Sequence, residues 1–340
     1  MDVATTTAAA LLDVPVGEAG DLLDGLVRGH LVKQVGAGRF GWHDLLRDYA
    51  VSLAAAEDPV AQREAVVRRA LRHFLHTLAA AGALTGSNVL RLPAETGAEP
   101  VVAQSFADGK EATAWLAAEW ENVATVVTSV SCHPELVWRV AESLSAVLYR
   151  TRSATEWLPL VAVGIQAARR AGEPVGEGAL RLALARAHWL RSEHTASGEE
   201  CTRALELFRA AEWPHGESAA LRGLAIALCH LGEVDRSIEN FQASIAIDRG
   251  IGDRRGVAVN LCNLATVHDE LGQFAESVRL TSQSLPLLRE IGHRQAEAVA
   301  LANLGAARHD QGRLRAATAA LTRPCGSARS SAPGTPRPSR

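Results

Sequence analysis

The residues of this chain whose types and spacing could do chemistry are two asparagines in matching surroundings. Asn263 and Asn303 lie 40 residues apart, each preceded by Leu and one further residue and followed by Leu. A side-chain amide can donate to and accept from an extended peptide backbone at the same time. The pair therefore favours polypeptide recognition, although a local role, in which each amide caps or packs within its own segment, stays open.

The histidines, cysteines and carboxylates do not form a pattern that indicates catalysis or metal binding. His73 and His76 are three residues apart without an acidic third ligand at helical spacing, whereas zinc needs three or four converging donors. No two of the five cysteines have the two-residue separation of zinc or redox motifs. Glu119 and Glu121 fall on different faces of a helix, so they are not a carboxylate pair for acid–base work. We predict no catalytic residue and no metal site.

The lysines do not mark a nucleotide-binding loop. Lys110 lacks the upstream glycine and the following hydroxyl residue of the loop that cradles phosphates, and Lys33 is the only other lysine. We therefore expect no cofactor in this chain alone and no enzymatic activity.

Composition limits the partners and the compartment. The formal net charge is -3 at pH 7, which gives no overall attraction to phosphate backbones or anionic membranes. No stretch approaches the roughly 18 apolar residues of a membrane span, and the N-terminus lacks the features of a signal peptide. We expect a cytoplasmic protein that binds protein or peptide, with no direct nucleic acid and no membrane partner.

An internal repeat of 40 residues organises the C-terminal half. Leu231-Gly232, Leu271-Gly272 and Gln311-Gly312 are in register, and apolar residues recur at helical spacing in two runs per unit. Each unit is therefore predicted to be two helices, with Gly232, Gly272 and Gly312 ending the first helix. A weaker unit precedes these, so residues 171–322 form the predicted array.

The repeat resembles the tetratricopeptide family, in a variant of about 40 residues. Small residues at the closest helix crossing are matched by Ala225, Ala265 and Gly305, and the second-helix aromatic by Phe241. The second-helix alanine positions hold Ser237, Ser244, Ser277 and Ser284 instead. Pro286 is predicted to interrupt and kink its helix.

The resemblance implies an α-solenoid whose first helices line a concave groove that binds a ligand. The predicted groove residues are Arg222, Ile226, His230, Cys262, Asn263, Thr266, Glu270, Ala302 and Asn303.

The repeat pattern stops after Leu321. Residues 323–340 are rich in Ser, Pro and Arg, a composition that predicts disorder. The abrupt change suggests a frameshift or a natural truncation, which would expose the apolar side of Leu304, Leu314 and Leu321.

Residues 1–56 have the element order of a winged helix. A helix at Thr7–Leu12, a second helix with Leu23 on its apolar stripe, strands at Leu31–Val35 and Arg39–Trp42 and a helix at His43–Ala54 are predicted. The second helix carries Glu18, Asp21 and Asp24 against one Arg28, so phosphate repulsion disfavours DNA readout. Residues 57–170 are predicted to be a helical connector, and the fold class is all-α.

This N-terminal segment resembles the winged helix of bacterial NB-ARC transcriptional regulators of the antibiotic-regulatory-protein type (SARP/AfsR-like, STAND). Trp42-His43-Asp44 matches a triplet whose histidine contacts the β-phosphate of ADP in that family, with Trp in place of Met. Phe106-Ala107-Asp108, Trp115-Leu116 and 119–123 resemble the stretch before its repeats, so the resemblance covers nearly all of 8–322. It implies that the nucleotide-binding domain would precede residue 1 and that His43 binds ADP only if such a domain is supplied.

The prediction is a non-catalytic, protein- or peptide-binding scaffold or sensor portion of a transcriptional regulator. The alternative is an ADP- or ATP-dependent switch subunit in which another segment provides the phosphate-binding loop and His43 completes the site. Direct DNA binding is the weakest of the three. The sequence leaves the identity of the partner and the oligomeric state open.

Overall fold

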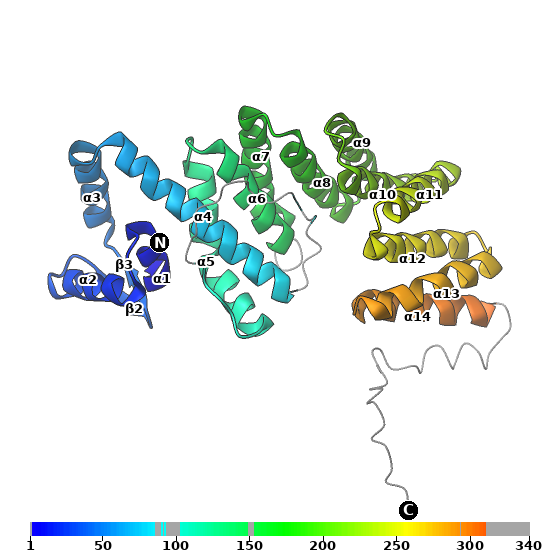
Figure 1. Cartoon of the computed structure of the whole chain (residues 1–340), viewed down its shortest axis with the longest axis horizontal. Coiled ribbons are helices and arrows are strands. Elements are labelled where there is room, and N and C mark those ends of the chain that lie inside the picture. Colours follow the sequence, from blue (N-terminus) through cyan, green and yellow to red (C-terminus); the bar gives the residue numbers. More distant parts are fainter. Residues whose placement is uncertain are drawn as a thin grey trace, which may run out of the picture. The chain divides into compact units, whose positions relative to one another are not determined.

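A computed structural model of the chain describes residues 2–85, 90, 92, 103–148, 153–292 and 294–310. The described residues are mainly helical (Figure 1), which confirms the predicted all-α class with a small N-terminal β-element. The chain divides into two compact units, Met1–Gly216 and Glu217–Arg340. The predicted features within 311–340, Gly312, Leu314 and Leu321 among them, lie outside the described residues.

A small sheet and three helices form the N-terminal part of the first unit. The elements are β1 (Asp2–Ala4), α1 (Thr5–Leu12), α2 (Val16–Arg28), β2 (Lys33–Gly36), β3 (Arg39–Gly41) and α3 (Asp44–Glu57). The predicted hairpin is present, but β1 was not predicted, and it pairs antiparallel with β3 to give the order β1-β3-β2. Ala8, Leu23, Val32 and Phe40 form the core of this part. Its assignment as a winged helix stays a prediction.

Arg39 connects this sheet to the following helices. Its guanidinium bonds to Asp2 on β1 and to Glu119 on α5 (Gly109–Ser129), whose side chain is almost fully buried. The hydrogen bond to Asp2 is the largest effect that raises the pKa of Arg39. Arg69 Nε also donates to the carbonyl oxygen of Leu11 at 2.8 Å. The N-terminal part is therefore held to the helices by charge as well as by apolar packing.

The region predicted to be a connector packs as helix hairpins. Its helices are α4 (Val60–Thr85), α5, α6 (Pro134–Leu148) and α7 (Ala154–Ala171), followed by α8 (Pro174–Leu190) and α9 (His194–Ala210). From α4 to α7, each helix packs against the next one and, for α4, α5 and α6, also against the next but one. Leu71, Trp138, Trp157 and Leu180 belong to one continuous core. Alternating contacts of this kind are those of a solenoid.

Helix starts follow a regular 20-residue step. Nine helices of the described part, α6 to α14, begin at 134, 154, 174, 194, 214, 234, 254, 274 and 294. The later ones are α10 (Pro214–His230), α11 (Val234–Gly250), α12 (Arg254–Glu270), α13 (Phe274–Glu290) and α14 (Arg294–Asp310). Two such helices account for the 40-residue repeat, and the step extends N-terminal to the predicted first unit.

The helix ends explain the step. Residues with positive φ lie between helices at Gly172, Ser192, Glu212, Gly232, Gly252, Gly272 and Gly292. A left-handed residue ends a helix by turning the chain, and glycine adopts this conformation without a side-chain penalty. The predicted helix ends at Gly232 and Gly272 are confirmed.

Buried serines pack the two helices of a hairpin together. Ser237 Oγ donates to the carbonyl oxygen of Ala225 at 2.8 Å, and Ser284 Oγ to that of Ala258 at 2.8 Å. Ser237 and Ser284, which stand at alanine positions, are therefore small and also satisfy their own hydroxyl groups, whereas the hydroxyl group of the buried Ser277 has no hydrogen-bond partner. The predicted interruption at Pro286 is wrong, because α13 is one helix from Phe274 to Glu290. Pro286 faces solvent, and the buried Leu285 and Leu288 hold the helix on its other side.

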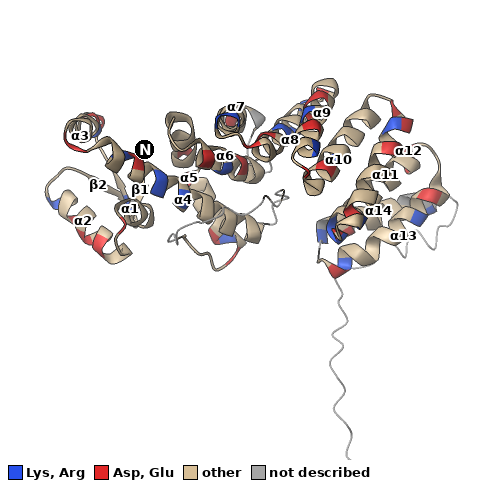
Figure 2. Ribbon diagram, turned by 45° about the horizontal axis from the view of Figure 1, so that its top comes forward, with Lys and Arg blue, Asp and Glu red and all other residues tan. Residues whose placement is uncertain are grey.

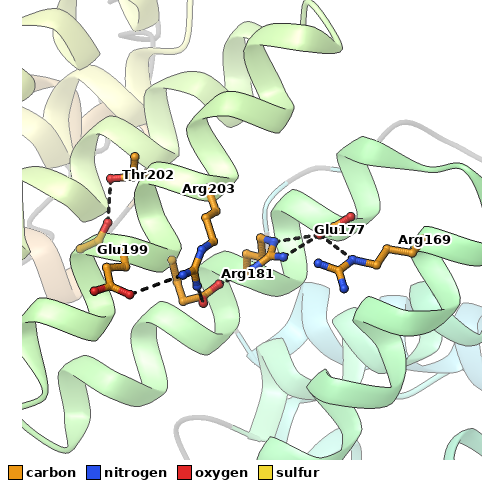
Figure 3. A network of polar contacts seen from close by, with 8 residues as sticks. Arg169, Glu177, Arg181, Glu199, Thr202 and Arg203 are labelled. Carbon is orange, nitrogen blue, oxygen red and sulfur yellow. Dashed lines mark hydrogen bonds and ion pairs between the residues drawn. The ribbon is translucent and has the colours of Figure 1, made fainter.

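Alternating charges connect α7, α8 and α9 (Figure 3). Glu177 on α8 accepts from Arg169 Nε on α7 at 3.0 Å and from Arg181 Nε at 2.9 Å. Arg181 also reaches Glu200 on α9 at 2.6 Å, and Glu200 pairs in turn with Arg203. The chain of ion pairs therefore crosses two successive helix contacts. No helix within the described ranges combines enough length and apolar character to cross a membrane.

Candidate ligand-binding face of the repeats

The candidate site lies on the first helices of the hairpins, here called A helices, in the second unit. These are α10 from Glu217 onward, α12 and α14; α11 and α13 are the second, or B, helices. The A helices α12 and α14 pack directly against each other. Their outward residues therefore form one surface, called the A-helix face below.

Two of the predicted site residues are brought together on this face. Asn303 Nδ2 on α14 donates to Thr266 Oγ1 on α12 at 2.9 Å. Thr266 Oγ1 donates in turn to the carbonyl oxygen of Cys262 at 3.2 Å. The amide of Asn303 is thus used to bridge two A helices.

Asn263 occupies the same position one repeat earlier but has a different neighbour. The residue at the Thr266 position of α10 is Ile226, which has no hydroxyl group. Asn263 is half-buried, and its side chain makes no hydrogen bond with any described residue. Its amide therefore has no hydrogen-bond partner among the described residues.

The remaining predicted residues divide between surface and core. His230, Glu270 and Ala302 are exposed, while Arg222 and Ile226 are half-buried. Cys262 is buried among Leu285, Leu288 and other residues of the α12–α14 core, so it does not belong to the surface as predicted. Its neighbour Asn263 faces outward instead, because adjacent helix residues point about 100° apart.

Cys229 was not predicted, although it lies on the same face. Its thiol donates to Glu270 Oε2 at 3.7 Å. Burial raises the pKa of the Cys229 thiol, and the charge of Glu270 adds to the effect. Cys229 is therefore a neutral packing residue of the face rather than a reactive thiolate.

His43 is far from this face in sequence and lies at the N-terminus of α3. Its ring is exposed, and it makes no side-chain hydrogen bond that caps the helix. The preceding Trp42 packs against the core of the N-terminal part. The histidine is thus presented outward, while its tryptophan neighbour holds the chain in place.

The other described histidines do not belong to a cluster of metal ligands. His73 is buried against the ring of Phe74, with ring centroids 5.6 Å apart. Across the described residues, no group of three or more His, Cys, Asp or Glu side chains is arranged to hold a metal ion.

Sequence reasoning missed a buried polar cluster between α10, α11 and α12. It consists of Ser218, Ser244, Asp248 and Asn260. Comparison of the repeats could have found it, because the positions of Asp248 and Asn260 are Leu288 and Ala300 one repeat later.

The fold and the A-helix face define a helical-repeat protein of the tetratricopeptide type. Residues 216–290 match the family described as tetratricopeptide repeat. The apo form of RapI has the same kind of fold, with a TM-score of 0.52, at 13% sequence identity and over 82% of this chain and 68% of that one.

Two curated relatives share part of the sequence. The regulatory protein AfsR of Streptomyces griseus is 31% identical over 215 residues, which are 62% of this chain and 22% of that protein. The regulatory protein AfsR of Streptomyces coelicolor is 32% identical over 127 residues, 35% of this chain and 12% of that protein. The chain therefore matches less than a quarter of the length of either relative.

Proposed function

We propose that this chain is the protein- or peptide-binding scaffold or sensor portion of a transcriptional regulator. The repeat match and the relatives named regulatory proteins support this proposal. The chain acts by binding and carries out no chemistry of its own. No cofactor takes part in this binding.

The unpaired amide of Asn263 carries the proposal. Its counterpart Asn303 already donates to a hydroxyl oxygen at 2.9 Å, so a ligand at Asn263 would supply an acceptor where α10 has Ile226. A peptide backbone offers both an acceptor and a donor to a side-chain amide. The half-exposed Val299 and the half-buried Ile226 give apolar contacts for ligand side chains on either side. An extended peptide is therefore the ligand that we propose for the A-helix face.

Asn263→Ala tests the proposal with a peptide selected from a library of short random peptides displayed on phage. We expect the affinity of the selected peptide to fall about fivefold, since a hydrogen bond contributes about 1 kcal/mol net. The matched control is Asn240→Ala on the B helix α11, where the amide donates only to the carbonyl of Arg236 within the same helix. Fluorescence anisotropy measures both variants.

The control should bind the peptide like the unchanged chain. Failure to select any peptide, or equal loss of affinity in the two variants, would refute binding at Asn263.

A second candidate function is the nucleotide-dependent switch, with the phosphate-binding loop on a further polypeptide segment. The exposure of α3 favours this function. The helix has no buried residue, and its Leu45 and Tyr49 are 85% and 64% exposed. A helix of this length is marginal without tertiary packing. A further protein domain that covers α3 would lie beside the exposed His43.

Calorimetric titration with MgADP tests the switch. The chain alone should show no heat of binding, because His43 by itself is one ligand of a missing site. Binding of MgADP by the chain alone would contradict both candidate functions.

Direct DNA binding is not part of the proposed function. Glu18, Asp21 and Asp24 on α2 are exposed. Figure 2 shows acidic residues, in red, along this helix. Negative charge on this helix repels phosphate. Duplex binding that weakens steeply with added salt would overturn this part of the proposal.

A further inference from the structure

The contact between α11 and α12, called here the α11–α12 junction, lacks an ion pair that two other junctions have. Arg169 Nε pairs with Glu177 at 3.0 Å where α7 meets α8, and Arg289 Nε pairs with Glu297 at 2.6 Å where α13 meets α14. The same repeat positions at the α11–α12 junction hold Arg249 and Val257. Valine cannot pair with the arginine, so other groups must join these two helices.

A buried polar cluster takes this place. Asp248 on α11 is 2% exposed and Asn260 on α12 is 0% exposed. Asn260 Nδ2 donates to Asp248 Oδ2 at 2.8 Å and to Ser244 Oγ at 2.7 Å. The hydroxyl groups of Ser244 and Ser218 lie 2.8 Å apart. The interior of the junction therefore contains a polar cluster in addition to the apolar side chains of Phe241, Ile245, Val257 and Leu261.

The backbone of α12 is shaped to admit the carboxylate. A Cβ atom added at Gly256 would collide with the carboxylate of Asp248. The residue one repeat later is Ala296, which lies beside an apolar junction. The absence of a side chain at Gly256 therefore makes room for the carboxylate of Asp248.

The neighbouring repeats show that the fold does not require these polar residues. Phe208 and Leu288 take the position of Asp248, and Ala220 and Ala300 take that of Asn260. All four of these apolar side chains are fully buried. A carboxylate at a position that normally packs with Phe or Leu is costly to bury, so its presence calls for an explanation beyond packing.

The charges around Asp248 leave the carboxylate incompletely compensated. Burial is the largest effect and raises the pKa of Asp248, and Asp253 before α12 also raises it. Arg222 on α10, Ser218 and Asn260 oppose this shift without cancelling it. Asn260 Oδ1 is buried without a hydrogen-bond donor, and a protonated Asp248 would add a donor to the cluster.

We propose that the α11–α12 junction is a protonation-dependent joint of the repeat array, which is closed when Asp248 is neutral and opens more readily when Asp248 is ionised. Opening lets water reach the carboxylate, so the ionised form favours the open state. The closed state binds the proton more tightly than the open state does. The joint is therefore most stable at low pH and loses stability as pH rises above the ordinary range of an aspartate, until Asp248 is ionised in the closed state too.

Hydrogen exchange of backbone amides tests the joint on the full chain. Protection factors, corrected for the intrinsic exchange rate, are compared at about pH 4, near the ordinary aspartate pKa, and at about pH 7.5 for peptides from α11 and α12. We expect protection to fall with rising pH, by up to about tenfold for each pH unit over which Asp248 titrates. Peptides from α14 serve as the internal control, because Leu288 and Ala300 stand there at the positions of Asp248 and Asn260.

Two variants separate the proposal from general pH effects. Asp248→Asn keeps the shape and removes the charge, so α11 and α12 should be equally protected at both pH values. Asp248→Leu combined with Asn260→Ala copies the next repeat and should behave in the same way. If the unchanged chain has the same protection at both pH values, or if Asp248→Asn keeps the pH dependence, the proposal is wrong.

Discussion

At the scale of single residues, Glu142 is a carboxyl group inside an apolar core. Burial raises its pKa to about 7 from the ordinary 4.5, against the opposing charges of Arg186 and Arg139. Its Oε2 atom has no hydrogen-bond partner. The folded state therefore holds a proton that the unfolded state releases above about pH 4.5.

Glu142→Gln should change how stability depends on pH. Since the folded pKa is raised, the free energy of unfolding of the unchanged chain falls between pH 4.5 and about 7, by about 3 kcal/mol in total. The neutral glutamine removes this fall. Urea unfolding across this pH range measures it, with the exposed Glu206→Gln as the control. A parallel pH dependence in Glu142→Gln and the unchanged chain would contradict the assignment.

Arg39 compensates the charge of a second carboxylate that is buried in the fold, Glu119. Arg39→Met removes the partner of Glu119, which is 1% exposed and would remain a buried, uncompensated charge. We expect the free energy of unfolding to fall by about 3 kcal/mol. Adding Glu119→Gln should recover part of the loss. Arg47→Met is the matched control and should stay within about 0.5 kcal/mol, because the Arg47 ion pairs are exposed.

At the scale of elements, the left-handed residues at the helix ends determine whether replacing a glycine with alanine lowers or raises the stability of the chain. Gly272 has a φ of 71° and open space around an added Cβ, so Gly272→Ala should cost about 1 kcal/mol through the backbone alone. Gly250 is the last residue of α11 and also has open space, but its φ is not positive. Gly250→Ala should therefore stabilise by about 0.5 kcal/mol.

Thermal unfolding of the two variants measures the difference. Ser192 tests the same reasoning in reverse: its φ is 61°, so Ser192→Gly should stabilise the chain. Destabilisation of similar size by Gly272→Ala and Gly250→Ala would show that backbone strain is not the cause.

The repeat explains why most elements could be predicted from the sequence. Matched pairs such as Leu231-Gly232 and Leu271-Gly272 fix the phase of the helices, because a glycine is conspicuous where a helix must end. Ser192 and Glu212 adopt the same left-handed conformation without glycine, so the 20-residue step was invisible further upstream. Strand β1 was missed because its three residues carry no turn signal and depend on pairing with β3.

The candidate site could be predicted only in part. Periodicity brings Asn303 and Thr266 to one face, and their hydrogen bond follows from this placement. Periodicity alone could not decide between Cys262 and Asn263, which are adjacent at the edge of the face, and packing against Leu285 places Cys262 in the core. The cluster around Asp248 depends on contacts among three helices, and in the sequence only a comparison of the repeats, where Leu288 and Ala300 take the positions of Asp248 and Asn260, marks it.

At the scale of the whole molecule, exposed apolar side chains gather near the N-terminus. Among the described residues, eleven of the eighteen exposed large apolar side chains lie between Leu12 and Val60. The repeats show isolated examples such as Leu231 at 41% exposure. Scattered apolar residues are normal on a protein surface, whereas a concentration of them marks an interaction site.

This distribution predicts that the isolated chain associates with itself at high concentration through its N-terminal part. Leu45→Ser combined with Tyr49→Ser should weaken the association, because it removes two of the three most exposed large apolar side chains of α3. The same change should alter the free energy of unfolding by no more than about 0.5 kcal/mol, since neither side chain is buried. Sedimentation equilibrium over a range of concentrations measures the association, and Leu231→Ser in the repeats is the control. Equal weakening by the control would show that the exposed apolar residues near the N-terminus do not drive association. The exposed face of α3 would then no longer support the proposal that a further domain covers this helix.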